Sequence, residues 1–144
     1  MKMIRNKSKK GFTLVELIVV LVILAVLAAM LVPALTGYIK RAREEKEYQT
    51  ASTMYSAAQA VITDMYGRNK ITGAGSLTNE TVDYGDDVYE LAGVDDSIVT
   101  AYTFNYDSNF IITGGSVTVT QNSKVSTYTL TITNGQPEWK ATTA

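Results

Sequence analysis

The positions of apolar and polar residues divide the chain into three parts. Residues 12–32 are apolar throughout except for Glu16 and Thr13. From 35 to 65 apolar residues recur every three or four positions between charged and small polar residues, a spacing typical of an amphipathic helix. From Ile98 onward apolar and polar residues alternate, which predicts β-strands. The order of these patterns predicts a long N-terminal helix packed against an antiparallel sheet, an α+β fold.

The apolar run 12–32 is long enough to cross a membrane. Its 21 residues would form a helix about 32 Å long at ~1.5 Å per residue, and the hydrocarbon core is about 30 Å thick. Five basic residues precede it: Lys2, Arg5, Lys7, Lys9 and Lys10. By the positive-inside rule they are expected to keep the N-terminus in the cytoplasm and to place the chain after Pro33 outside. An ordinary secretory signal is the alternative, but this run exceeds the usual length of ~7 to 15 residues and contains a carboxylate.

We expect the helix to continue through residues 34–66 and to stop at Gly67. A helix over 12–66 would be roughly 80 Å long. One small domain cannot cover that length, so the first half must contact lipid or other copies of the chain. Pro33 has no amide hydrogen for the carbonyl of Ala29 and should kink or weaken the helix. It either marks the membrane exit or is a soft spot in the helix.

The rest of the chain predicts loops followed by a sheet. Residues 67–97 contain five glycines and are expected to be loop-rich, with short strands at 81–84 and 88–91. Residues 98–140 predict a meander of about four strands with one apolar face, which the stripe of apolar residues at 51–65 is available to cover. The expected tight turns are Gly114-Gly115, Asn122-Ser123 and Asn134-Gly135. The C-terminal region could be held by strand pairing, with Gln136 to Lys140 and Trp139 as candidates.

Composition disfavours catalysis and nucleic-acid binding. The chain has no Cys and no His, which removes thiol nucleophiles, imidazole bases, disulfides and most zinc sites. Without residues 1–11 the chain contains eight basic and 14 acidic residues. Eight of these acids lie between Glu80 and Asp107, where there is no Lys or Arg. A nucleic-acid partner would require a basic surface, so none is expected.

Four carboxylates in the acidic region are weak candidates for a calcium site: Asp86, Asp87, Asp95 and Asp96. Carboxylate oxygens are the ligands that Ca²⁺ prefers. Their spacing is not that of an EF-hand loop, so we expect a solvated loop and no cofactor.

The segment Lys9-Lys10-Gly11-Phe12-Thr13-Leu14-Val15-Glu16 closely resembles the prepilin signal of type IV pilins and of the pseudopilins of type II secretion and competence systems. The resemblance is tightest from Lys9 to Pro33. It implies a pilin fold, cleavage after Gly11 by a membrane-embedded prepilin peptidase, and methylation of the new amine of Phe12. Because Gly11 has no side chain, a protease can approach this peptide bond closely.

Glu16 is the only charged residue in the apolar run 12–32. An ionised carboxylate in hydrocarbon costs about 2.5 to 3.5 kcal/mol on insertion scales, so it is expected to have a partner. Cleavage would create that partner, the cationic amine of Phe12. Pairing with the amine of the next subunit would set axial register. Pairing within one chain, at four-residue spacing, is the competing interpretation.

The resemblance implies a structural subunit and not an enzyme. It divides the chain into a leader (1–11), a transmembrane and assembly half of the helix (12–33) and an extracellular domain (34–144). The implied partners are other copies in a helical filament, the prepilin peptidase, an assembly platform, and the membrane during storage. The protein would be a single-pass cytoplasmic membrane protein before assembly and would then reach the cell surface.

The preferred function is that of a type IV pilus subunit, used in adhesion, motility or aggregation. The main alternative is a pseudopilin of a secretion or DNA-uptake system. A filament-tip adhesin is a third possible function, and an enzyme or solute-binding domain on a simple anchor is a fourth. Glu16 favours a filament component over an anchored domain.

Overall fold

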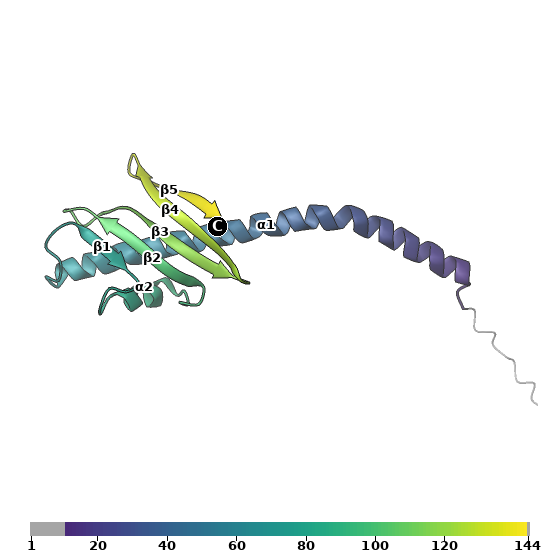
Figure 1. Cartoon of the computed structure of the whole chain (residues 1–144), viewed down its shortest axis with the longest axis horizontal. Helices are drawn as coiled ribbons and strands as arrows, with labels where there is room; N and C mark the ends of the chain where they lie inside the picture. The colour runs from purple at the N-terminus through teal and green to yellow at the C-terminus, as the bar shows by residue number, and fades with distance from the viewer. Residues whose placement is uncertain (1–10, 144) are drawn as a thin grey trace, which may run out of the picture. The chain divides into compact units, whose positions relative to one another are not determined.

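The computed structural model describes residues 11–143 and shows an α+β fold (Figure 1). Its first element is helix α1, Leu14–Gly67. The predicted combination of a long N-terminal helix and an antiparallel sheet is therefore confirmed. The chain divides into two compact units between Ala42 and Arg43, and each is described by itself.

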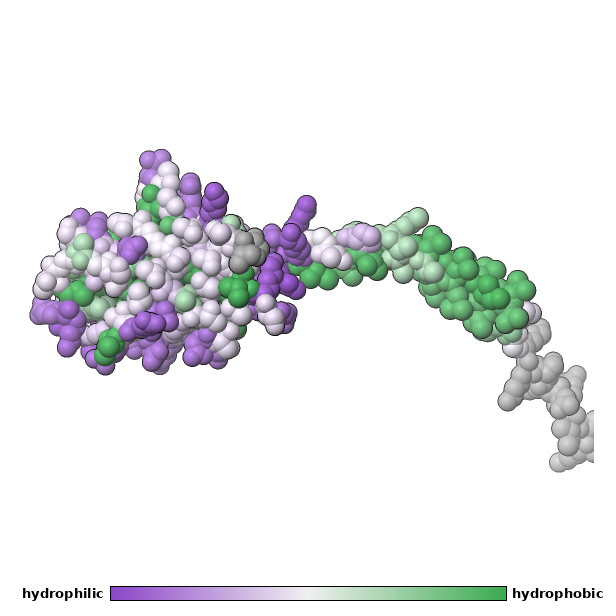
Figure 2. Space-filling view, in the orientation of Figure 1, coloured by the Kyte–Doolittle hydropathy of each residue, from purple (hydrophilic) through white to green (hydrophobic). Residues whose placement is uncertain are grey.

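The N-terminal unit is helical from Leu14 and strongly apolar. All side chains from 12 to 42 are exposed, including Leu17, Ile23 and Leu27, which are each about half exposed. By length and composition α1 contains a segment able to cross a membrane, and none of that segment is buried within the chain. Figure 2 colours the surface of the N-terminal part of this helix green, and the surface turns white and then purple farther along the helix. This unit therefore has an apolar surface that its own chain does not cover.

The second unit contains a five-stranded antiparallel sheet in which each strand pairs with its neighbours in sequence. The strands are β1 (Gly75–Thr78), β2 (Val99–Tyr106), β3 (Ile112–Gln121), β4 (Lys124–Thr133) and β5 (Gln136–Thr143), in that spatial order. The strand at 136–143 is the predicted C-terminal pairing segment, and it pairs with β4 along its length.

The core lies between one face of the sheet and the outer part of α1. Buried residues of α1 recur at helical spacing: Ala51, Met54, Ala57, Ala58, Val61, Ile62 and Met65. They pack in one cluster with alternate residues of the strands, such as Tyr102 and Phe104 of β2 and Tyr128 and Leu130 of β4. The predicted cover by residues 51–65 is confirmed. Each fully buried large apolar side chain contributes about 1.5–3 kcal/mol.

Two of the three predicted turns are present. Asn122 and Ser123 have φ of 50° and 63°, and Asn134 and Gly135 have φ of 52° and 76°. Two consecutive residues with positive φ are the requirement of a type I′ hairpin turn, which Asn and Gly meet at least cost. These turns join β3 to β4 and β4 to β5.

The turn predicted at Gly114-Gly115 was wrong, because both residues lie inside β3. A Cβ at Gly115 would clash with the carbonyl oxygen of Thr103 and lie 3.0 Å from Cα of Phe104. Glycine in a strand often marks such a close approach of another backbone. Gly115 therefore lets β3 pass close to β2, whereas a Cβ at Gly114 would lie 3.3 Å from the carbonyl oxygen of Leu130 on β4. Neither glycine reverses the chain.

The loop-rich assignment of 67–97 was also incomplete. This region contains β1 and a second helix, α2 (Gly85–Ala92), so the strand predicted at 88–91 is helical and the one at 81–84 is a turn. Gly85 and Val88 are buried at three-residue spacing, as a helix requires. Gly93 ends α2 in the left-handed conformation at φ 64°, and its amide donates to the carbonyl of Glu90. This is a common way to end a helix.

Candidate processing and assembly site

The first turn of α1 is closed by a reciprocal pair of hydrogen bonds. The amide of Glu16 donates to Oγ1 of Thr13 at 3.2 Å, and the amide of Thr13 donates to Oε2 of Glu16 at 3.3 Å. This is a capping box, which provides partners for two backbone donors at a helix start. The carboxylate in the first turn also lies favourably in the field of the helix dipole.

The capping box was missed in the sequence, although its signal is there. A Thr followed three residues later by Glu, directly before an apolar run, is the usual pattern of a helix start. Thr13 and Glu16 stand at that spacing. Glu16 thus has a local partner within its own chain, in addition to the proposed pairing with a Phe12 amine.

The predicted cleavage position lies next to this cap. Phe12 is 87% exposed, and a Cβ on Gly11 would meet no heavy atom within 4 Å. Phe12, Val15 and Glu16, with Val19 and Val20, line one shallow hollow on the helix. The structure therefore brings the first predicted mature residue and Glu16 to the same side of the helix. The predicted basic leader residues 1–10 lie outside the described residues.

Pro33 lies within α1, which remains helical on both sides of it. Proline donates no hydrogen bond to the carbonyl four residues earlier. Three residues later the hydroxyl of Thr36 donates to the carbonyl of Val32 at 2.9 Å, and hydroxyls bonded in this way often accompany bends in helices. At Gly37 a Cβ would meet open space. The role of Pro33 as a soft spot stays a prediction.

A second feature that the sequence did not reveal is a buried carboxylate in α1. Glu47 is only 4% exposed and accepts a short hydrogen bond from the hydroxyl of Tyr128 on β4. The ring of Tyr48 meets the ring of Tyr128 edge-on at 5.0 Å. Burial, followed by the hydrogen bond to Glu47 and its charge, raises the pKa of Tyr128 well above its usual value. The donor to Glu47 lies 81 residues away in the sequence, so no local pattern around Glu47 shows that it is buried.

The four calcium candidates do not form one site. Asp86, Asp95 and Asp96 line a hollow between α2 and the loop that follows it. Asp87 instead lines the groove between α1 and α2. Oδ1 of Asp95 accepts the amide of Ser97 at 2.8 Å. Among residues 11–143 no three acidic side chains converge at a spacing that could hold a metal ion.

Residues 6–32 match the family described as the prokaryotic N-terminal methylation motif. The match spans the predicted cleavage bond, Glu16 and the whole of the apolar run 12–32 that precedes Pro33. No solved structure matches the chain. The comparison therefore supports an N-terminal methylation motif at residues 6–32 and does not extend to the rest of the chain.

Proposed function

We propose that this type IV pilin-like prepilin, which carries the N-terminal methylation motif at residues 6–32, is a structural subunit of a type IV pilus filament. It would be cleaved after Gly11, methylated on the amine of Phe12 and assembled through the N-terminal half of α1. Adhesion, motility and aggregation are the roles that such a filament would serve.

One observation carries this proposal: an uncovered apolar helix begins directly after the candidate cleavage bond. The residues from 14 to 32 are exposed and mostly apolar. Full burial of a large apolar side chain contributes about 1.5–3 kcal/mol, and most of these side chains, which are about half exposed, would gain roughly half of that. Lipid can bury them before assembly. In a filament, the same helices of neighbouring subunits would take the place of lipid.

Hydrolysis of the Gly11-Phe12 bond would change the electrostatics of this helix start. It would leave a carboxylate on Gly11 and a protonated amine on Phe12, on the same side of the helix as Glu16. We expect that amine to compete with the Thr13 amide for the Glu16 carboxylate, since a cation attracts an anion more strongly than a neutral donor does. Cleavage would therefore release the leader and also create a cation with which Glu16 can pair. That cation is either the amine of its own chain or, where the pair sets axial register, the amine of the next subunit.

Mass spectrometry of the mature protein tests the cleavage. We expect an N-terminus at Phe12 with the mass of one added methyl group. A mature chain that keeps residues 1–11, or begins elsewhere, would contradict the proposal.

The variant Glu16→Ala tests assembly. It should be cleaved normally and should yield far fewer filaments, measured by electron microscopy of sheared surface material. Glu45→Ala is the matched control, because Glu45 is an exposed acid of the same helix outside the motif. Equal filament yield from wild type and Glu16→Ala would refute the role of Glu16.

The alternative, a pseudopilin, shares the motif and the helix. Filament length separates the two functions. Long surface fibres support the pilus, whereas short structures confined to the cell envelope, together with loss of protein secretion or DNA uptake on deletion, support the pseudopilin.

A further inference from the structure

A groove lies between α1 and α2 on the second unit. Its volume is about 460 Å³, and its lining residues are Ala60, Val61, Asp64, Asp87, Glu90 and Leu91. Leu91 is 61% exposed, and Asp87 and Glu90 are also exposed. We call this feature the acidic groove. It combines an apolar floor with an anionic rim.

The wall of the acidic groove formed by α2 is fixed in place. The buried Val88 packs into the core. The hydroxyl of Tyr102 donates to the carbonyl of Gly85 at 2.7 Å, and that of Tyr89 donates to the carbonyl of Val99 at 2.9 Å. Because α2 is tied to β2 at its first residue and at its middle, the groove is formed before any partner arrives.

The rim of the acidic groove has an excess of negative charge. Asp64 forms an ion pair with Arg68 at 2.7 Å. That is the one ion pair among residues 11–143, and the charge of Asp87 also helps to raise the pKa of Arg68, after the larger contribution of Asp64. Three acids thus share one nearby cation, and neither Asp87 nor Glu90 forms an ion pair of its own within the described chain. The surrounding stretch from 80 to 107 has eight acids and no basic residue. A partner for this groove should therefore bring cations next to apolar side chains.

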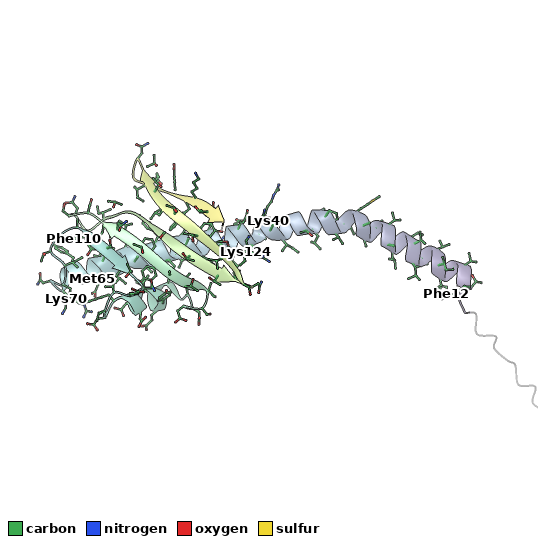
Figure 3. The ribbon with its side chains drawn as sticks, viewed as in Figure 1. Phe12, Lys40, Met65, Lys70, Phe110 and Lys124 are labelled. Carbon is green, nitrogen blue, oxygen red and sulfur yellow. The ribbon has the colours of Figure 1, made fainter. Side chains whose placement is uncertain are left out.

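The same chain contains a segment with that composition. Leu35, Tyr38 and Ile39 are 56%, 71% and 49% exposed. They are followed by Lys40, Arg41 and Arg43, none of which forms an ion pair within the described part of the chain. Figure 3 shows the side chain of Lys40 extending away from its helix. We call residues 35–43 the basic segment.

Arg43, the last residue of the basic segment, cannot reach the acidic groove of its own chain. Arg43 precedes Ala60 by 17 residues of one continuous helix, which corresponds to about 25 Å along the axis. An Arg43 that contacts this groove therefore belongs to a second copy of the chain.

We infer that the basic segment of one copy docks in the acidic groove of a neighbouring copy. This inference rests on the proposed filament function. The two surfaces lie on different parts of the chain, so the contact is head-to-tail and can repeat without closing, as a filament requires. Opposite charges across it would set the orientation of the subunits, and the apolar side chains would be buried between them.

Charge reversal in the full-length chain tests the contact. Asp87→Lys with Glu90→Lys, and separately Arg41→Glu with Arg43→Glu, should each lower filament yield about tenfold, because like charges would then face each other. Combining all four changes should restore much of the yield. The control pair Glu138→Lys and Lys140→Glu reverses exposed charges of β5 and should have no effect. If either groove or segment reversals leave yield unchanged, or the combination is no better than each alone, the inference is wrong.

Crosslinking tests the same contact without requiring complete filaments. The chain has no Cys, so Arg41→Cys and Glu90→Cys introduce the only thiols. A short bis-maleimide added to cells should give a ladder of multimers from the double variant and at most dimers from each single variant. A double variant that remains monomeric would overturn the contact. If the wild type is not cleaved after Gly11, the proposed function fails separately, and the ladder still reports on the contact.

Discussion

Both halves of α1 are helical, but only the second half buries apolar side chains within the chain. Residues 14–42 expose every side chain, whereas residues 43–67 bury a stripe from Glu47 to Met65 beneath the sheet. Between residues 17 and 35 the first half is apolar around its whole circumference, and a sheet can cover only one side of such a helix. The second half has charged and small polar residues on the side away from the core.

This difference shows that the packing partner of a helix depends on how much of its circumference is apolar. A helix with one apolar stripe can bury that stripe against a single sheet of the same chain. A helix that is apolar on all sides needs lipid or several neighbours. The contrast can be tested by substitutions that should affect one half and not the other.

The largest contrast is expected between two truncations in α1. Ile62→Ala, at a fully buried position, should lower the free energy of unfolding of the second unit by about 2–5 kcal/mol. Leu24→Ala, at a position that is 56% exposed, should leave that value unchanged and reduce filament yield. Urea unfolding of the full chain in detergent, followed by the fluorescence of Trp139, measures the first effect. Equal destabilisation by both changes would remove the distinction between the halves.

A side chain at Gly115 should destabilise the second unit by about 1–3 kcal/mol through overpacking. Gly115→Ala would press a methyl group against the backbone of β2. Gly73→Ala is the control, since a Cβ there meets nothing within 4 Å. The same unfolding assay measures both, and a neutral Gly115→Ala would contradict the close approach of β2 and β3.

Removing the hydroxyl of Tyr128 should cost about 1–3 kcal/mol, because Tyr128→Phe leaves the buried carboxylate of Glu47 without its donor. The double variant Tyr128→Phe with Glu47→Leu should recover part of the loss, since it removes both polar partners. A Tyr128→Phe variant as stable as wild type would mean that Glu47 is hydrated in solution.

The free energy of unfolding at high pH should also depend on Tyr128. Its pKa is raised in the folded state by burial and by Glu47, and the pKa of Tyr102 is raised chiefly by burial. Their neutral forms favour folding, so this contribution is complete below about pH 10 and is lost as the pH rises above it. Unfolding measured at pH 8 and pH 11 should show a smaller loss for Tyr128→Phe than for wild type. An identical pH dependence would contradict this linkage.

The smallest effect is expected at the start of α1. Thr13→Ala removes the hydroxyl that caps the first turn, at a cost of about 0.5–1 kcal/mol in local helix stability. Hydrogen exchange in detergent should become faster at the amides of residues 15–17 and should stay unchanged in residues 51–65. Thr13→Ser is the control that keeps the cap.

The main elements were predictable because their patterns are local. The spacing of Ala51, Met54 and Ala58 identifies the buried side of α1, and Asn134-Gly135 identifies a hairpin turn without reference to the rest of the chain. The motif around Glu16 was recognisable for the same reason, since its residues are adjacent.

The errors occurred where a distant partner determines the conformation. Gly115 lies in a strand because Thr103 and Phe104 approach it closely, and no neighbour in sequence shows this. Gln59 is a similar case. Its side-chain amide donates to the carbonyl of Phe110 at 2.8 Å, and its oxygen accepts the amide of Ile112 at 2.9 Å. Helix α2 is eight residues long, and so short an apolar pattern does not distinguish a helix from a strand.

The order of strands in the sheet determines how the second unit can fold. Every strand pairs with the next one in the chain, and two-residue turns connect β3 to β4 and β4 to β5. Such short-range pairings close small loops, so they lower the entropic barrier to folding, and a single hairpin forms in about 1–10 μs. The residues of α1 that line the core precede all the strands in the chain. During synthesis each new hairpin can therefore add to a surface that already exists, and β5 completes the unit last.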